Sequence, residues 1–139
     1  MHAGSLEGAT VRIASREEVS RLPRWSRAFA GGRKDYRYYE LVEDTLTDGF
    51  SYGYLVIESG GDVRAIQPYF IVDQDLLGGI SGFAKRCFDT VRRVWPRFMR
   101  ARTLMVGCSA GEGHLDAPDM PQAALAEALA GARSRASWR

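Results

Sequence analysis

One stretch, residues 52–72, constrains the fold of this chain more than any other. It holds two runs of β-forming residues, 52–58 and 63–72, joined by Ser-Gly-Gly-Asp at 59–62. Two glycines in so short a connection permit the positive φ angles of a tight hairpin turn. Pro68 lies within the second run and has no backbone N–H, so we expect it at a sheet edge or a bulge. The chain therefore contains an antiparallel sheet.

The segment before this hairpin predicts one short strand and two helices. Residues 11–14 are a strand candidate, and Ser15 follows with Glu18 three residues later, which is the pattern of a helix capping box. The first helix would run to about residue 29, kinked or shortened by Pro23. Asp35 is a second N-cap candidate, and apolar residues at helical spacing follow it to about residue 46.

The segment after the hairpin predicts a helix, a strand and a final helix. Residues 80–99 have one apolar face and end or bend near Pro96. A strand over 103–106 or 103–108 leads into a glycine-rich loop, and Pro121 opens a helix over 121–133. The expected order is β-α-α-β-β-α-β-α, an α+β fold in one domain over 11–133, with residues 1–10 and 134–139 disordered.

Composition excludes several classes of protein. The 139 residues are 45% hydrophobic and 26% charged, as in ordinary globular domains. Two cysteines and two histidines do not have metal-ligand spacing, so we expect no metal site and a reducing, cytoplasmic compartment. No apolar run reaches the roughly 18–20 residues of a membrane helix. The net charge of +2 gives no strong case for nucleic-acid binding, although 84–102 holds seven basic residues against Asp89.

The sequence TLMVGCSAGEGHLD at 103–116 is the most chemically suggestive segment, and it admits three interpretations. Glycines after a strand are found in S-adenosylmethionine-dependent methyltransferases, but the acidic residue and the immediate helix of that motif are missing here. Cys108-Ser109-Ala110-Gly111-Glu112-Gly113 has the two glycines of an acyl-CoA pyrophosphate loop without its leading Gln or Arg. Alternatively, the glycines simply permit a turn.

Three segments read together resemble a bacterial group of GNAT-superfamily or Fem-like N-acyltransferases. They are DYRYYELVEDTL, the hairpin YLVIESGGDVRAIQPYFIVDQDLL and RTLMVGCSAGEGHLDAP, and they cover about residues 33–118. The resemblance implies a GNAT-like fold with a mixed, mainly antiparallel sheet and flanking helices. It also implies that the C-terminal half of such a domain is missing. The fourth strand would then be an exposed edge, which favours self-association or low stability.

The resemblance also implies an activity and its residues. An acyl group would move from acetyl-CoA or another acyl-CoA to a small-molecule or peptide amine. Glu112 and His114 are the candidate bases, and the cofactor-binding candidates are Cys108, Ser109, Ala110, Gly111 and Gly113. Other interpretations remain open: a solvated loop for Glu112 and His114, and a non-catalytic interaction domain for the whole chain.

Further expectations concern partners and other polar residues. We expect no nucleic acid and no stable membrane insertion, although a Fem-like role would add tRNA or anionic lipid as partners of the basic residues at 84–102. A solvated face is the simpler interpretation of those residues. Asp73, Asp75 and Gln67 are candidates to line the acceptor site, and Asp116 is a candidate turn cap.

Overall fold

The structure is a computed structural model that describes residues 9–75, 77–78, 81–111, 114–116 and 130. The elements follow the order β1 (Thr10–Ala14), α1 (Arg16–Ser20), the 3-10 turn η1 (Trp25–Arg27), α2 (Tyr36–Thr45), β2 (Phe50–Ser59), β3 (Asp62–Asp75), α3 (Phe83–Val94) and β4 (Arg100–Val106). This confirms the expected order as far as the fourth strand. The expected final helix at 121–133 and the two expected disordered ends lie almost wholly outside the described residues.

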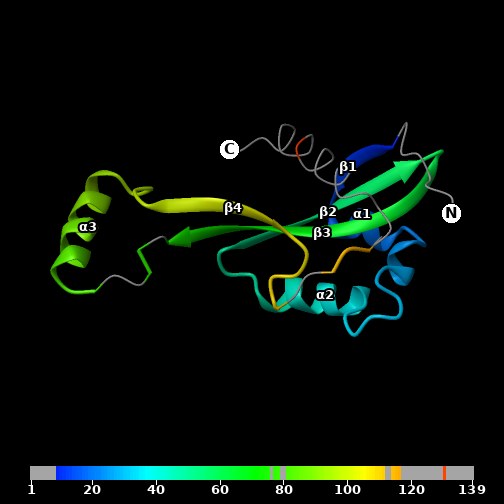
Figure 1. The fold of residues 1–139 in the computed structure, drawn as a ribbon, viewed down its shortest axis with the longest axis horizontal. Helices are drawn as coiled ribbons and strands as arrows, with labels where there is room; N and C mark the ends of the chain where they lie inside the picture. Colours follow the sequence, from blue (N-terminus) through cyan, green and yellow to red (C-terminus); the bar gives the residue numbers. More distant parts are fainter. Residues whose placement is uncertain (1–8, 76, 79–80, 112–113, 117–129, 131–139) are drawn as a thin grey trace, which may run out of the picture.

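The four strands form one curled, antiparallel sheet in the order β1-β2-β3-β4 (Figure 1). The fold is therefore α+β. Every strand pair in the described part of the chain is antiparallel, whereas a mixed sheet was expected. The hairpin turn lies where the sequence predicts it, because Gly60 and Gly61 both have positive φ angles, 64° and 85°.

Two helix predictions were too long. The Ser15–Glu18 capping box forms as expected, yet α1 ends at Ser20 because Pro23 cannot supply the next backbone donor. The chain continues as turns and η1, which place Trp25 in the core with only 2% of its surface exposed. Likewise, α3 spans Phe83–Val94 instead of 80–99. By contrast α2 begins as predicted, with the Asp35 carboxylate accepting from Arg37 N.

The core lies between α2, η1 and one face of the sheet. Trp25 packs edge-on against Tyr54 at 5.1 Å between ring centroids, and Phe29 stacks on Tyr39 at 4.5 Å. Val56 and Ile66, a directly opposed cross-strand pair, are fully buried beneath them. Aromatic pairs of this kind add about 0.5–1.5 kcal/mol each beyond their burial. This cluster fixes α2 against β2, which positions the site described below.

Pro68 marks the point where the sheet opens. It pairs with Tyr54 of β2 on one side, so it is not on an outer strand. On its other side the β4 ladder ends one residue away, at the pair Tyr69 and Val106, and Gly107 N donates to Pro68 O at 2.8 Å. Because Pro68 has no N–H, the ladder has no donor with which to continue. Pro68 therefore lies at a local sheet edge, as expected, because β4 pairs with β3 only over Tyr69–Asp75.

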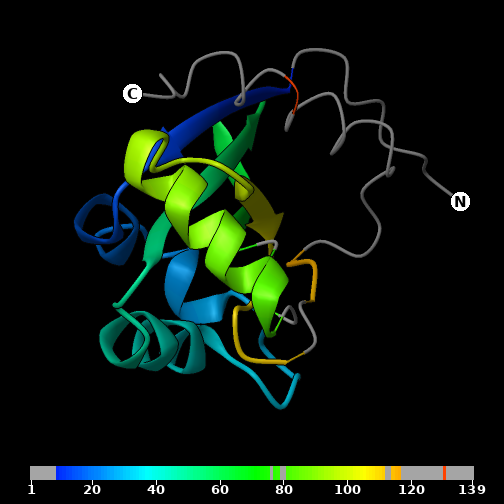
Figure 2. The same cartoon turned by 90° about the vertical axis from the view of Figure 1, so that its left-hand side faces the viewer.

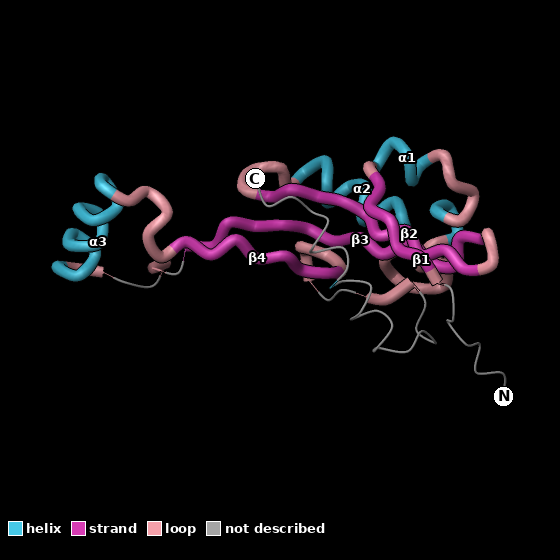
Figure 3. Tube along the Cα trace, turned by 90° about the horizontal axis from the view of Figure 1, so that it is seen from above, coloured by secondary structure: helices cyan, strands magenta, loops and turns pink. Residues whose placement is uncertain are grey.

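The far ends of β3 and β4 form a long arm that carries α3 (Figure 1). Seen from above, α3 lies at the tip of this arm, away from α1 and α2 (Figure 3), and in the view along the arm α3 lies in front of the sheet (Figure 2). Arg92 attaches the helix to the arm by donating to both carboxylate oxygens of Asp75, at 2.8 and 2.5 Å. None of the residues of α3 is buried.

Candidate functional site

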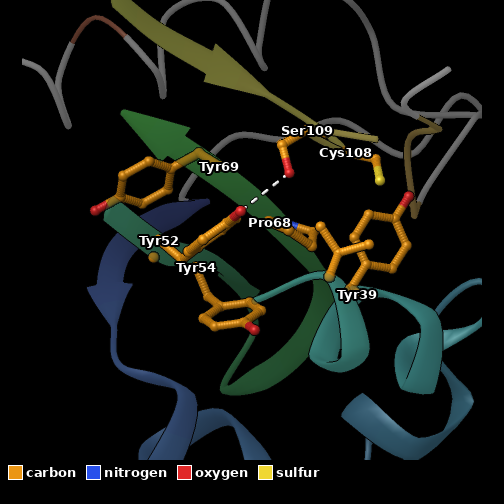
Figure 4. A pocket seen from close by; sticks show the side chains of 10 residues that line it. Tyr39, Tyr52, Tyr54, Pro68, Tyr69, Cys108 and Ser109 are labelled. Atoms are coloured by element: carbon orange, nitrogen blue, oxygen red, sulfur yellow. Dashed lines mark hydrogen bonds between the residues drawn. The ribbon is translucent and has the colours of Figure 1, made fainter. Parts of the chain in front are cut away.

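The loop that follows β4 lies beside a pocket where the sheet opens. We call residues 107–111 the post-β4 loop. Gly107 has a φ of 114°, a conformation that favours glycine, and it turns the chain away from β3 directly after Val106. Cys108 and Ser109 then line the pocket (Figure 4). The glycine that the sequence predicts to permit a turn therefore also positions two of the predicted cofactor-binding residues.

Ten residues line this space, which we call the tyrosine pocket. It holds about 240 Å³ of empty space that is partly open to solvent, with room inside for about one water-sized group. Its walls come from α2, β2, β3 and the post-β4 loop: Tyr39, Val42, Tyr52, Gly53, Tyr54, Pro68, Tyr69, Gly107, Cys108 and Ser109. The pocket therefore suits a small group or one end of a larger ligand.

The hydroxyl of Tyr39 is the unusual polar atom of this pocket. Tyr39 is 4% exposed, and its hydroxyl makes no hydrogen bond by distance and angle among the described residues, although the His114 backbone is near enough to act on the pKa of the phenol. Burial raises the pKa of the Tyr39 phenol, so the group stays protonated and remains a donor. A buried hydroxyl without a partner costs about 1–3 kcal/mol. A ligand or water that accepts from Tyr39 would remove this cost.

A second hydroxyl pair lies across the pocket. Tyr52 Oη donates to Leu46 O at 2.8 Å, and it lies 3.1 Å from Ser109 Oγ (Figure 4). Because the single phenol proton of Tyr52 is directed to Leu46, Ser109 is the donor in the second bond. The lone pairs of Ser109 Oγ then remain able to accept from a ligand N–H. The pocket thus offers an acceptor at Ser109, whereas the Tyr39 hydroxyl is closed off within the pocket wall and points towards Cys108 and the post-β4 loop (Figure 4).

The remainder of the post-β4 loop is held by α2 and the segment before it. Ala110 O accepts from Lys34 Nζ at 3.2 Å and from Tyr38 Oη at 3.1 Å. Lys34 also lies 5.3 Å from the centre of the Tyr38 ring, and a Cβ added to Gly111 would lie 3.1 Å from Lys34 Nζ. A cation consequently lies against the glycine of the loop.

The loop returns to β3 through Gln67 and Asp116. Gln67, which is 2% exposed, donates to His114 O and accepts from Asp116 N. The Asp116 carboxylate accepts from Phe29 N and Ile66 N, each at 3.0 Å, and pairs with Arg24 at 2.7 Å. Asp116 thereby occupies the part of the β3 edge that β4 leaves uncovered. The sequence predicted only a turn cap at Asp116. In the structure the Asp116 side chain joins its own loop to β3 and to the segment that contains Arg24 and Phe29.

The structure separates the predicted site residues into three groups. Cys108 and Ser109 line the pocket, whereas Ala110 and Gly111 lie in the same loop beside Lys34. His114 is exposed and is not among the lining residues. Glu112 and Gly113 lie outside the described residues. Asp75 pairs with Arg92 in the arm, and the Gln67 side chain holds the loop, so neither belongs to the pocket lining.

Sequence reasoning missed the pocket residues on α2 and the strands. Tyr36, Tyr38 and Tyr39 come from the same turn of α2, yet they differ from one another in their contacts. Tyr36 packs against Trp25, Tyr38 binds the loop, and Tyr39 is both a core residue and a pocket residue. The signal was three tyrosines in one turn of helix, but only the tertiary structure assigns them separate roles.

Comparisons with known proteins add no constraint. No family model, no curated protein and no solved structure matches this chain. Within the described part of the chain, no helix is both long enough and apolar enough to cross a bilayer. The same residues contain no group of three or more His, Cys, Asp or Glu placed to hold a metal ion. The site must be interpreted from its own chemistry.

Proposed function

We propose that this chain is a GNAT-like N-acyltransferase whose post-β4 loop and tyrosine pocket bind an acyl-CoA. The observation that carries the proposal is the end of the β4 ladder at Val106, followed by a glycine turn that places Cys108 and Ser109 in a pocket beside α2. The strand and helix order through β4 agrees with the first half of the fold that the resemblance implies.

The pocket residues fit the acyl end of such a molecule. A thioester carbonyl accepts hydrogen bonds, and the Tyr39 hydroxyl, which is buried in the pocket wall, is the protonated donor that we propose for it. The amide groups next to the thioester in coenzyme A contain N–H donors, which the Ser109 lone pairs suit. With room inside for about one water-sized group, the pocket must widen even for an acetyl group, and it disfavours any longer acyl chain.

The loop residues fit the phosphate end. Glycines allow a backbone to approach a phosphate closely, and Gly111 has a φ of 87° that favours glycine. The Lys34 ammonium beside Gly111 supplies positive charge at the same place. Together they suit a pyrophosphate without a metal ligand.

Transfer of the acyl group requires the amine nitrogen to form a bond to the thioester carbon while the carbon–sulfur bond breaks. The amine must lose a proton, and the departing thiolate gains one. The described lining of the pocket contains no carboxylate and no imidazole. Glu112 and His114, which follow the loop directly, remain our proposed bases.

A methyltransferase function receives less support from the fold. Its nucleotide loop follows a strand of a mainly parallel sheet, whereas β4 is antiparallel to β3. A non-catalytic interaction domain remains the second candidate, because α3 presents apolar residues that nothing in the described structure covers.

Isothermal titration with acetyl-CoA tests the proposal. We expect saturable binding with a micromolar Kd in the unaltered chain, and loss of the binding heat in Ser109→Trp, whose side chain fills the pocket. Ser20→Trp is the matched control, because it makes the same substitution at an exposed position of α1, which contributes no residue to the pocket lining. No binding heat, or equal binding by Ser109→Trp, would contradict the proposal.

A further inference from the structure

The helix at the tip of the arm has an apolar stripe that faces solvent. Phe83, Cys87, Val91 and Val94 are spaced by three or four residues and lie on one side of α3. Phe83 is 82% exposed, Val94 89% and Val91 40%, and Trp95, directly after the helix, is 62% exposed. Isolated exposed apolar residues are ordinary, but a contiguous stripe with an adjacent tryptophan marks an interaction surface.

The stripe is held in a fixed orientation. Arg92 binds Asp75 with two hydrogen bonds and donates to Phe98 O at 3.2 Å. Phe98 packs against Phe88 and Trp95, with ring centroids 6.0 and 5.8 Å apart. These contacts use the side of α3 that faces the arm, so the apolar stripe of Phe83, Cys87, Val91 and Val94 faces away from the arm.

Basic side chains surround this stripe. Lys85, Arg86 and Arg93 lie on the polar side of α3, and Arg97, Arg100 and Arg102 follow it along the chain, whereas Asp89 is the helix's one acidic residue. Residues 73–102, which form the arm and its helix, hold seven basic residues against Asp73, Asp75 and Asp89, and subtraction from the totals of 19 and 17 leaves 12 basic and 14 acidic residues elsewhere in the chain. Positive charge is thus concentrated at the arm tip.

We propose that the arm tip, consisting of α3 with Trp95, docks on an anionic lipid surface. An amphipathic helix with cations beside aromatic and aliphatic side chains lies in the headgroup region with its apolar face buried about 5–10 Å deep. Anionic headgroups complement the cations, and lipid tails accept the stripe without requiring a matching groove. The position of α3 at the end of the arm leaves it accessible to a flat surface (Figure 3).

Charge argues against the alternative occupants. Two α3 stripes packed together would bring Arg86 and Arg93 of each copy close to the cations of the other, which is unfavourable. Nucleic acid would satisfy the cations but would leave Phe83, Val91 and Val94 against a charged backbone. A lipid surface satisfies both the apolar and the basic residues.

Co-sedimentation of the full chain with vesicles tests this proposal. The vesicles are phosphatidylcholine alone or phosphatidylcholine with about one third phosphatidylserine. We expect binding to the second kind only, weakened by salt because screening shortens the reach of the cations. Each cation near an anionic surface raises the vesicle partition coefficient about fivefold. The double variant Arg86→Gln with Arg93→Gln removes two cations and should therefore lower the partition coefficient about 25-fold. Phe83→Ser with Val94→Ser should lower it at least about tenfold.

Matched controls separate the helix from general surface chemistry. Leu41→Ser with Arg37→Gln removes an exposed apolar and an exposed basic residue from α2, and it should bind vesicles as the unaltered chain does. A cooperative melt shared by all variants shows that each is folded. The proposal is overturned if the unaltered chain does not bind anionic vesicles at low salt, or if the α3 variants bind them as well as the unaltered chain does. It is also overturned if the chain does not bind vesicles and α3 instead forms the contact in a dimer or in a complex with tRNA.

Discussion

Replacing Asp116 tests the connection between the post-β4 loop and the sheet. Its side chain is 1% exposed, and its two oxygens accept from Phe29 N and Ile66 N and pair with Arg24. Asp116→Ala leaves two backbone donors without partners, at about 1–3 kcal/mol each, and leaves the partly exposed Arg24 cation without its partner. We expect the free energy of unfolding to fall by about 2–6 kcal/mol, a large part of the total stability of a small domain.

Urea unfolding followed by circular dichroism measures this loss. Asp116→Asn keeps one acceptor oxygen and should lose less stability than Asp116→Ala. Asp48→Ala, at an exposed position, is the control and should stay within about 0.5 kcal/mol of the unaltered chain. If Asp116→Ala unfolds within about 1 kcal/mol of the unaltered chain, the loop is not held to β3 as described.

Three further predictions concern the pocket, the arm and α1. Gly53→Ala should cost about 1–3 kcal/mol in urea unfolding, because the new Cβ would overlap the Tyr69 ring and lie 2.7 Å from its Cε1; unchanged stability would show that Tyr69 can move aside freely. Arg92 holds the pKa of the Asp75 carboxyl below its usual range, so the pair should contribute stability above the unfolded pKa of about 3.9 and lose it as the pH falls through the lower folded value. In a ¹³C NMR titration, an Asp75 midpoint at or above about 3.9 would contradict this pairing. Ser15→Ala should lower the free energy of unfolding by about 1 kcal/mol through loss of the α1 cap, and an unaltered melting curve would argue against the capping box.

Local signals in the sequence were sufficient for the hairpin and for the two helix starts. Gly60 and Gly61 require a turn wherever they occur between β-forming runs, and Ser15 and Asp35 cap helices through contacts within three residues. Helix ends were less predictable. Apolar periodicity continues beyond Ser20, but Pro23 and the burial of Trp25 favour turns there.

The candidate site depends on contacts that periodicity does not encode. Asp116 reaches Phe29, which is 87 residues away in sequence, and Ser109 reaches Tyr52 across 57 residues. The pattern at 80–99 correctly indicated an amphipathic helix. It gave no information about what covers the apolar face, and in the described structure that face is exposed because β3 and β4 extend α3 away from the core (Figure 1).

The most direct test of the proposed function is to map acetyl-CoA onto the chain by amide NMR. We expect the largest shift changes at Gly107, Cys108, Ser109 and Gly111, with smaller changes at Tyr39 and Tyr52 across the pocket. Ser109→Trp should abolish these changes, and Ser20→Trp, at an exposed position of α1, should preserve them. No shift changes at saturating ligand, or changes confined to α3 and the hairpin turn, would contradict an acyl-CoA site at the post-β4 loop.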